Sequence, residues 1–146
     1  ALFVPLIISS GGNSGSQAAS LIIRAMALKE LQLWDWWYVM KKEFVSGLLL
    51  GGILGLLGFI RIVIWQETGI YDYGPYWLWV ALSVSTSLLF IVLWGTLSGS
   101  LIPFLLRKMK LDPAAASAPF VATLVDVTGL IIYFSVSALF LAGKLL

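Results

Sequence analysis

One aspartate stands inside an otherwise apolar stretch near the carboxyl end of the chain. Asp126 lies seven residues after Pro119 in the stretch SAPFVATLVDVTGLIIYF. Helical geometry would place it about 10 Å along a helix. A carboxylate at that depth in a membrane is costly and indicates a functional site by default. No basic residue lies in the middle of an apolar segment. Asp126 would therefore either hold a cation or, when protonated, bond the backbone of a neighbouring helix.

The available ligands favour a hard divalent cation. The chain has no cysteine and no histidine, so only carboxylate, amide, hydroxyl and carbonyl oxygens remain. Such donors suit Mg²⁺, Ca²⁺ or Mn²⁺ better than Zn²⁺ or Cu⁺. Mg²⁺ tends to keep several waters and to use one or two carboxylates. A single carboxylate cannot dehydrate a doubly charged ion, whereas two copies of Asp126 across the axis of a homodimer would neutralise one. This charge arithmetic gives the hypothesis of a shared site.

A glycine-rich polar run, GGNSGSQ at residues 11–17, interrupts another apolar segment. Such sequence inside a membrane span favours unwound or closely packed backbone that lines a cavity. Backbone carbonyls there, with the amides of Asn13 and Gln17, could hydrogen-bond to water around a cation. The alternative is packing alone, because small residues let helices approach one another closely.

The elements that must position these residues are membrane helices. The chain has 146 residues, 60% hydrophobic and only 11% charged, against about 25% charged in soluble proteins. A charged, aromatic-rich stretch predicts an amphipathic helix along the membrane interface at 29–42. We therefore expect an all-α integral membrane protein, with one transmembrane domain over 1–146. The apolar stretches predict four spans, at about 1–28, 43–65, 76–106 and 119–143.

Basic residues predict the orientation of the bundle. Of nine Lys and Arg residues, two, Arg61 and Lys144, lie on one side. The other seven lie in or beside the linkers that join spans one and two and spans three and four: Arg24, Lys29, Lys41, Lys42, Arg107, Lys108 and Lys110. This excess places those linkers in the cytoplasm and both ends of the chain outside. The net charge of +2 is thus assigned to membrane topology rather than to nucleic-acid binding. Without His, Cys or a second buried carboxylate, no enzyme activity is expected.

Two signatures resemble the MgtE family of magnesium channels. The first is PLIISSGGNSGSQ at residues 5–17, followed by LIIRAMALKEL. The second combines Asp112-Pro113 with PFVATLVDVTGL at residues 119–130, and a K-E-x-x-x-G pattern beginning at Lys42 also fits. Together they cover essentially the whole chain. The resemblance implies a homodimeric pore in a bacterial plasma (inner) membrane, with five helices per subunit, which passes Mg²⁺ down its electrochemical gradient.

The resemblance also implies roles for individual residues. The central aspartate of the family falls on Asp126, which would hold a largely hydrated Mg²⁺ on the two-fold axis, helped by the carbonyl of Ala122. Residues expected along the pore, in contact with the water shell, are Gly12, Asn13, Gln17 and Thr123. The same oxygen donors would also accept Mn²⁺, Ca²⁺ or Co²⁺.

Further expectations concern the parts of family members outside residues 1–146, the partners of the chain, and the alternative functions. The first helix of the family would precede Ala1, and full-length members carry cytoplasmic domains, an acidic one and a CBS pair, that sense Mg²⁺ and that residues 1–146 do not contain. The expected partners are membrane lipids and a second copy of the chain, and no nucleic acid is expected. Two alternatives to a channel stay open: a proton- or sodium-coupled exchanger in which Asp126 titrates, and a non-transporting membrane anchor or assembly subunit.

Overall fold

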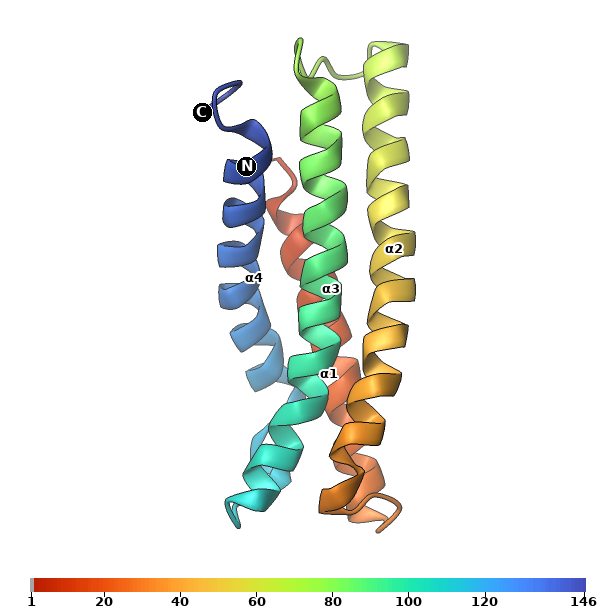
Figure 1. The fold of residues 1–146 in the computed structure, drawn as a ribbon, viewed down its shortest axis with the longest axis vertical. Coiled ribbons are helices and arrows are strands. Elements are labelled where there is room, and N and C mark those ends of the chain that lie inside the picture. The colour runs from red at the N-terminus through yellow and green to blue at the C-terminus, as the bar shows by residue number, and fades with distance from the viewer. Residues whose placement is uncertain (1) are drawn as a thin grey trace.

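The computed structural model describes residues 2–146, and these form an all-helical bundle, as predicted. The four long helices are α1 (Val4–Ala27), α2 (Trp36–Thr68), α3 (Trp77–Lys108) and α4 (Ala118–Leu141). Successive long helices run in opposite directions along one axis, with α3 in the middle and α2 and α4 on either side of it (Figure 1). Two short 3-10 helices, η1 (Leu33–Asp35) and η2 (Pro113–Ala115), lie in the linkers.

Three segments of the described chain are long and apolar enough to cross a membrane: Leu33–Thr68, Trp77–Lys108 and Ala118–Leu141. The first helix, α1, does not meet that criterion, because its polar run lowers the hydropathy. It nevertheless has 24 residues, which corresponds to about 36 Å, and it lies alongside α3 (Figure 1). A fourth span in α1 therefore remains a prediction, and Ala1, its predicted first residue, lies outside the described residues.

The amphipathic helix expected at 29–42 does not form as a separate element. Residues 33–35 are the 3-10 helix η1, and 36–42 are the first turns of α2, which continues without a break to Thr68. Nothing between Trp36 and Val45 breaks a helix, since this stretch contains neither glycine nor proline. At 33 residues, α2 is about 50 Å long, longer than the hydrocarbon core of about 30 Å. Residues 36–42 therefore belong to one continuous helix that is longer than the apolar core, and not to a separate interfacial helix.

The polar run of α1 is helical throughout, so of the two predicted states, unwound and closely packed, the structure has the second. Hydroxyl groups in the run donate hydrogen bonds to carbonyls of the preceding helical turn. Ser10 Oγ donates to the Leu6 carbonyl at 2.7 Å, and Ser14 Oγ donates to the Ser10 carbonyl at 2.8 Å. Gly15 is buried against Gly95 of α3. The glycines thus allow close contact between helices and do not interrupt the helix.

Both expected cytoplasmic linkers lie at one end of the bundle. The α1–α2 and α3–α4 linkers are at the lower end in Figure 1, whereas the α2–α3 loop and the carboxyl terminus are at the upper end. Pro103 lies inside α3, and the lower part of α3 bends away from the axis (Figure 1), because proline cannot donate a helical hydrogen bond. The end that carries seven of the nine basic residues is therefore the splayed end.

Candidate cation site at the contact between α1 and α4

Asp126 is half-buried on α4, where α4 faces the glycine-rich part of α1. A Cβ atom added at Gly12 would lie 2.6 Å from Asp126 Oδ1 and 3.7 Å from the Ala122 carbonyl oxygen. No real side chain fits at 2.6 Å without displacing the carboxylate. Three of the predicted site residues, Gly12, Ala122 and Asp126, are therefore brought together, and the lack of a side chain at Gly12 leaves room for the Asp126 carboxylate.

The buried face of α4 fixes the rotation of this helix. Val121, Val125 and Gly129 recur every four residues and are all buried, as expected for one face of a helix. A Cβ atom at Gly15 of α1 would meet the Val121 and Val125 side chains at 3.2 Å and 3.1 Å. Because Asp126 follows Val125 by one residue, about 100° around the helix, it lies at the edge of this packed face and is not enclosed by it.

A hydroxyl that the sequence analysis did not single out joins the two helices. Ser16 Oγ lies 3.0 Å from the Ala118 carbonyl and 2.8 Å from the Gly12 carbonyl, so its hydrogen is shared between α4 and α1. The contact attaches the first turn of α4 to the polar run of α1. Ser16 lies within the glycine-rich signature, but nothing in the sequence indicates its partner 102 positions away.

Three further predicted residues are exposed beside this contact. Asn13 and Gln17 lie on α1 and Thr123 lies on α4, and all three are exposed. Asn13 Nδ2 donates to Ser9 Oγ at 3.2 Å, and Thr123 Oγ1 donates to the Pro119 carbonyl at 3.0 Å. The Asn13 amide oxygen and the lone pairs of Thr123 Oγ1 are thus left to accept hydrogen bonds.

Helix geometry places these exposed groups on one side. Asn13 follows Gly12 by about 100° around α1, and Thr123 precedes Asp126 by about 300°, which is the same as following it by about 60°. Because α1 and α4 run in opposite directions (Figure 1), both rotations lead to the same side, opposite to α3. We call Ser9, Asn13, Gln17 and Thr123, with Asp126 at their edge, the polar stripe. It is an oxygen-rich band on the surface of an otherwise apolar bundle.

One chain supplies one carboxylate to this band. Within residues 2–146 no group of three or more His, Cys, Asp or Glu side chains could hold a metal ion. The Ala122 carbonyl and the other oxygen-bearing side chains of the polar stripe, two amides and two hydroxyls, are neutral. Such a set suits water around an ion better than direct coordination of a bare one.

Two side-chain hydrogen bonds connect α4 to α3, and the sequence did not predict either. Trp94 Nε1 donates to Thr128 Oγ1 at 2.8 Å. In the buried core, Ser83 and Ser137 hydroxyls lie 3.1 Å apart. Each contact fixes α4 against a helix that does not contribute to the polar stripe. The position of Asp126 therefore depends on α3 as well as on α1.

Comparison with known proteins identifies the family of the chain. Residues 4–136 match the family model MgtE, described as a divalent cation transporter. Proteins named magnesium transporter MgtE are 48% identical in Thermus thermophilus, 32% in Enterococcus faecalis and 31% in Bacillus subtilis. Each alignment covers 97% of this chain and 29% of the relative, so the chain spans less than a third of the length of these relatives. The match over most of its length shows that the chain belongs to the MgtE family of divalent cation transporters.

Proposed function

We propose that this chain forms the membrane pore of a magnesium channel, with the permeation path between two copies. The observation that carries the proposal is the polar stripe on an otherwise apolar bundle. Polar groups at membrane depth lie against protein or line a water-filled cavity and do not face lipid. A second copy that meets the first along α1 and α4 would turn two exposed stripes into the lining of one aqueous path. In this arrangement α1 is the fourth span.

The charge of the site suits one divalent ion. Two copies of Asp126 would supply two negative charges to a Mg²⁺ ion on the dimer axis. The ion keeps most of its water, and the Ala122 carbonyl, Asn13, Gln17 and Thr123 accept hydrogen bonds from that water. Selectivity then follows from the width of the path and from how well the oxygens fit a small, tightly hydrated ion. The names of the three relatives support Mg²⁺ over Mn²⁺, Ca²⁺ and Co²⁺.

The proposed location is the plasma membrane of a bacterium, with the two basic linkers in the cytoplasm. Seven of the nine basic residues lie at that end, and the relatives are bacterial. Lys144 Nζ, at the opposite end, lies 4.1 Å from the centre of the Trp79 ring. Aromatic side chains at this end would mark the outer headgroup region.

Mg²⁺ uptake into liposomes tests the proposal. Asp126→Asn keeps the size of the side chain and removes its charge, so uptake should fall to the level of empty liposomes. Glu67→Gln is the matched control, because Glu67 is an exposed carboxylate at the end of α2; its uptake should equal that of the parent. Equal uptake by the Asp126→Asn and parent chains would remove Asp126 from the path.

The driving force separates the proposal from a coupled exchanger. A channel takes up Mg²⁺ on a Mg²⁺ gradient alone, with no opposing gradient of protons or sodium ions. Uptake that appears only when such a gradient is imposed would make Asp126 a titrating carrier instead.

Cross-linking tests the pairing. The chain contains no cysteine, so a single introduced thiol reports only its own surroundings. Thr123→Cys should form a cross-linked dimer with a short bifunctional thiol reagent, because Thr123 would face its own copy across the water-filled path, which is too wide for a direct disulfide. Leu49→Cys is the control, since Leu49 is 63% exposed on the outer side of α2, and it should stay monomeric. Dimers from Leu49→Cys and none from Thr123→Cys would place the interface on α2.

A further inference from the structure

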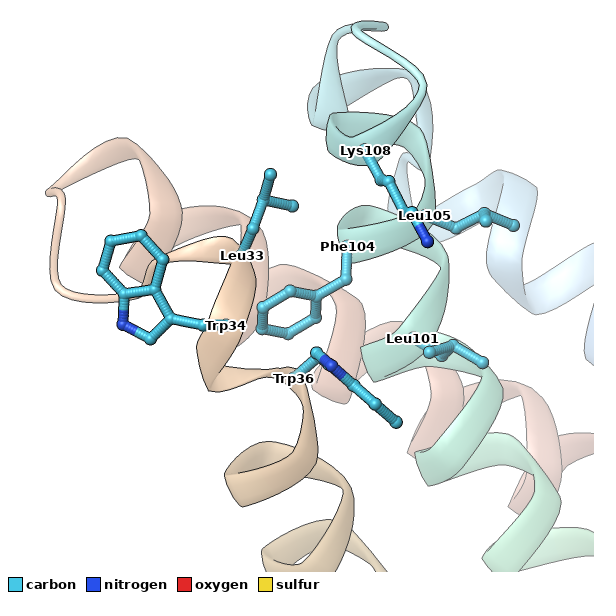
Figure 2. A pocket seen from close by; sticks show the side chains of 7 residues that line it. All are labelled: Leu33, Trp34, Trp36, Leu101, Phe104, Leu105 and Lys108. Atoms are coloured by element: carbon cyan, nitrogen blue, oxygen red, sulfur yellow. The ribbon is translucent and has the colours of Figure 1, made fainter.

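A groove lies between the start of α2 and the end of α3, away from the polar stripe. It has a volume of about 520 Å³, within the about 300–1,000 Å³ typical of small-molecule sites. Figure 2 shows that one wall comes from η1 and the first residue of α2 and the other from α3. The lining residues are Leu33, Trp34, Trp36, Leu101, Phe104, Leu105 and Lys108. Six of the seven are apolar or aromatic, and only Lys108 carries a charge.

The walls of the groove suit an acyl chain at the edge of the bilayer. Trp34 is 77% exposed and Trp36 46% exposed, and Leu105 on the facing wall is 52% exposed. Tryptophan is enriched at the headgroup level of membranes, whereas exposed leucines on a spanning helix face hydrocarbon. The groove therefore extends from the headgroup region into the apolar layer, as a lipid molecule does.

The charge at the groove suits an anionic headgroup. In Figure 2 the Lys108 side chain extends from α3 toward the apolar lining. Its neighbour Arg107 is held differently, because Arg107 Nη1 donates to the Leu31 carbonyl at 3.1 Å. The groove is also at the end of the bundle that carries seven of the nine basic residues. Basic pockets between membrane helices on the cytoplasmic side are sites for acidic lipid headgroups.

A second groove repeats this chemistry. It has a volume of about 410 Å³, lies beside the first turns of α2 and again combines an aromatic and apolar lining with one lysine. Its lining residues are Trp37, Met40, Lys41, Phe44, Val45 and Leu97. Lys41 Nζ lies 5.4 Å from the centre of the Trp37 ring. One lysine above an apolar groove is thus found twice at the same end of the bundle.

We propose that the groove between α2 and α3 binds one anionic phospholipid of the cytoplasmic leaflet. Its phosphate contacts Lys108, and an acyl chain lies along Trp34, Trp36 and Leu105. This site is separate from the proposed ion path, which uses α1 and α4, and its test does not depend on transport.

Lipid binding by the 146-residue chain, freed of lipid in detergent, tests the proposal by native mass spectrometry. The probes are phosphatidylglycerol, which is anionic, and phosphatidylcholine, which has no net charge. One lysine near a membrane surface contributes about 1 kcal/mol to binding an acidic lipid, or about fivefold. Lys108→Gln should therefore weaken phosphatidylglycerol binding about fivefold and leave phosphatidylcholine binding unchanged. Lys110→Gln, an exposed lysine outside the lining, is the matched control and should bind both lipids as the parent does.

A second variant tests the apolar wall. Trp34→Ala removes a mostly exposed side chain and should weaken the binding of both lipids while the chain stays folded. Together the two variants separate the headgroup contact from the acyl-chain contact.

Three results would overturn the proposal. Unchanged phosphatidylglycerol binding by Lys108→Gln would exclude the headgroup contact. Equal losses in Lys108→Gln and Lys110→Gln would indicate diffuse surface charge rather than a site. Disulfide-linked dimers formed by Leu105→Cys would show that a second copy of the chain covers the groove.

Discussion

Glycines on α2 and on α1 lie at close contacts between helices, and these contacts differ in what the glycines face. On α2, a Cβ atom at Gly51 would lie 2.8 Å from the Leu89 carbonyl oxygen, and one at Gly55 would lie 2.8 Å from that of Ser85. On α1, a Cβ atom at Gly12 would lie 2.6 Å from a carboxylate oxygen of Asp126. The first contact is glycine against backbone, and the second is glycine against a charged side chain. Glycine spacing thus indicates close approach, and the group opposite each glycine distinguishes packing from a site.

The largest expected loss of stability is at the contact between α1 and α3. A Cβ atom at Gly95 would lie 2.6 Å from the Gly11 carbonyl oxygen, and a helix backbone cannot rotate aside. Gly95→Val should lower the free energy of unfolding by about 3 kcal/mol or more, the upper range for overpacking. Thermal unfolding in detergent measures the change. Gly52→Val is the control, since nothing lies within 4 Å of its added Cβ; an equal loss there would point to helix propensity instead.

The next largest effect should fall on function and not on stability. In Gly12→Ala the added methyl group meets Asp126 Oδ1, at the end of a side chain that can rotate away. The chain should therefore stay folded, while the displaced carboxylate lowers Mg²⁺ uptake about tenfold, equivalent to about 1.4 kcal/mol. Gly129→Ala is the control on the same helix as Asp126, because its Cβ would meet Ile91 Cγ2 at an ordinary 3.5 Å. Parent-like uptake by Gly12→Ala would show that its contact with Asp126 does not matter for permeation.

The sequence predicted the positions of two helices and singled out Asp126, because each inference depends on local composition. The lengths of the apolar stretches predicted helices at about 76–106 and 119–143, and the structure has helices at Trp77–Lys108 and Ala118–Leu141. The cost of a carboxylate among apolar residues singled out Asp126 for the same reason. Neither inference required knowledge of which helices are neighbours.

Other features could not be predicted because they depend on how two helices are rotated against each other. The proximity of Gly12 and Asp126 needs both the depth and the rotation of α1 and α4, and the contact between Ser16 and the Ala118 carbonyl needs the same information. The start of α2 was misplaced for a different reason. Charge at 29–42 indicates contact with water, which a helix that extends out of the membrane satisfies as well as one that lies along it.

A smaller effect on stability should appear at the contact between α2 and α3. Gly51→Ala places a methyl group against the Leu89 backbone and should cost about 1–2 kcal/mol in the free energy of unfolding. Uptake per folded molecule should not change, in contrast to Gly12→Ala. Gly52→Ala, one residue along, should be neutral or slightly stabilising, because alanine favours helix more than glycine does. Loss of uptake by folded Gly51→Ala chains would extend the functional region to α2.

The smallest effect concerns the loop that closes the contact between α2 and α3. Asp72 Oδ1 accepts hydrogen bonds from Gln66 Nε2 at 3.0 Å and from the Gly74 amide at 2.8 Å, and these hold the pKa of Asp72 below its usual value. A carboxyl group whose pKa is lowered by folding contributes stability above its unfolded pKa of about 3.9. That contribution is lost as the pH falls through the lowered value in the folded chain.

The unfolding temperature of the parent should therefore fall more between pH 5 and pH 3 than that of Asp72→Asn. The difference should be small because the Asp72 side chain is exposed to solvent. Parallel curves for the two chains would show that the glycine contacts along α2, and not this loop, hold the hairpin closed. A stability advantage of the parent that is present at pH 5 and lost as the pH falls toward 3 would show instead that the loop carboxylate adds to the stability of a contact whose packing is glycine against backbone.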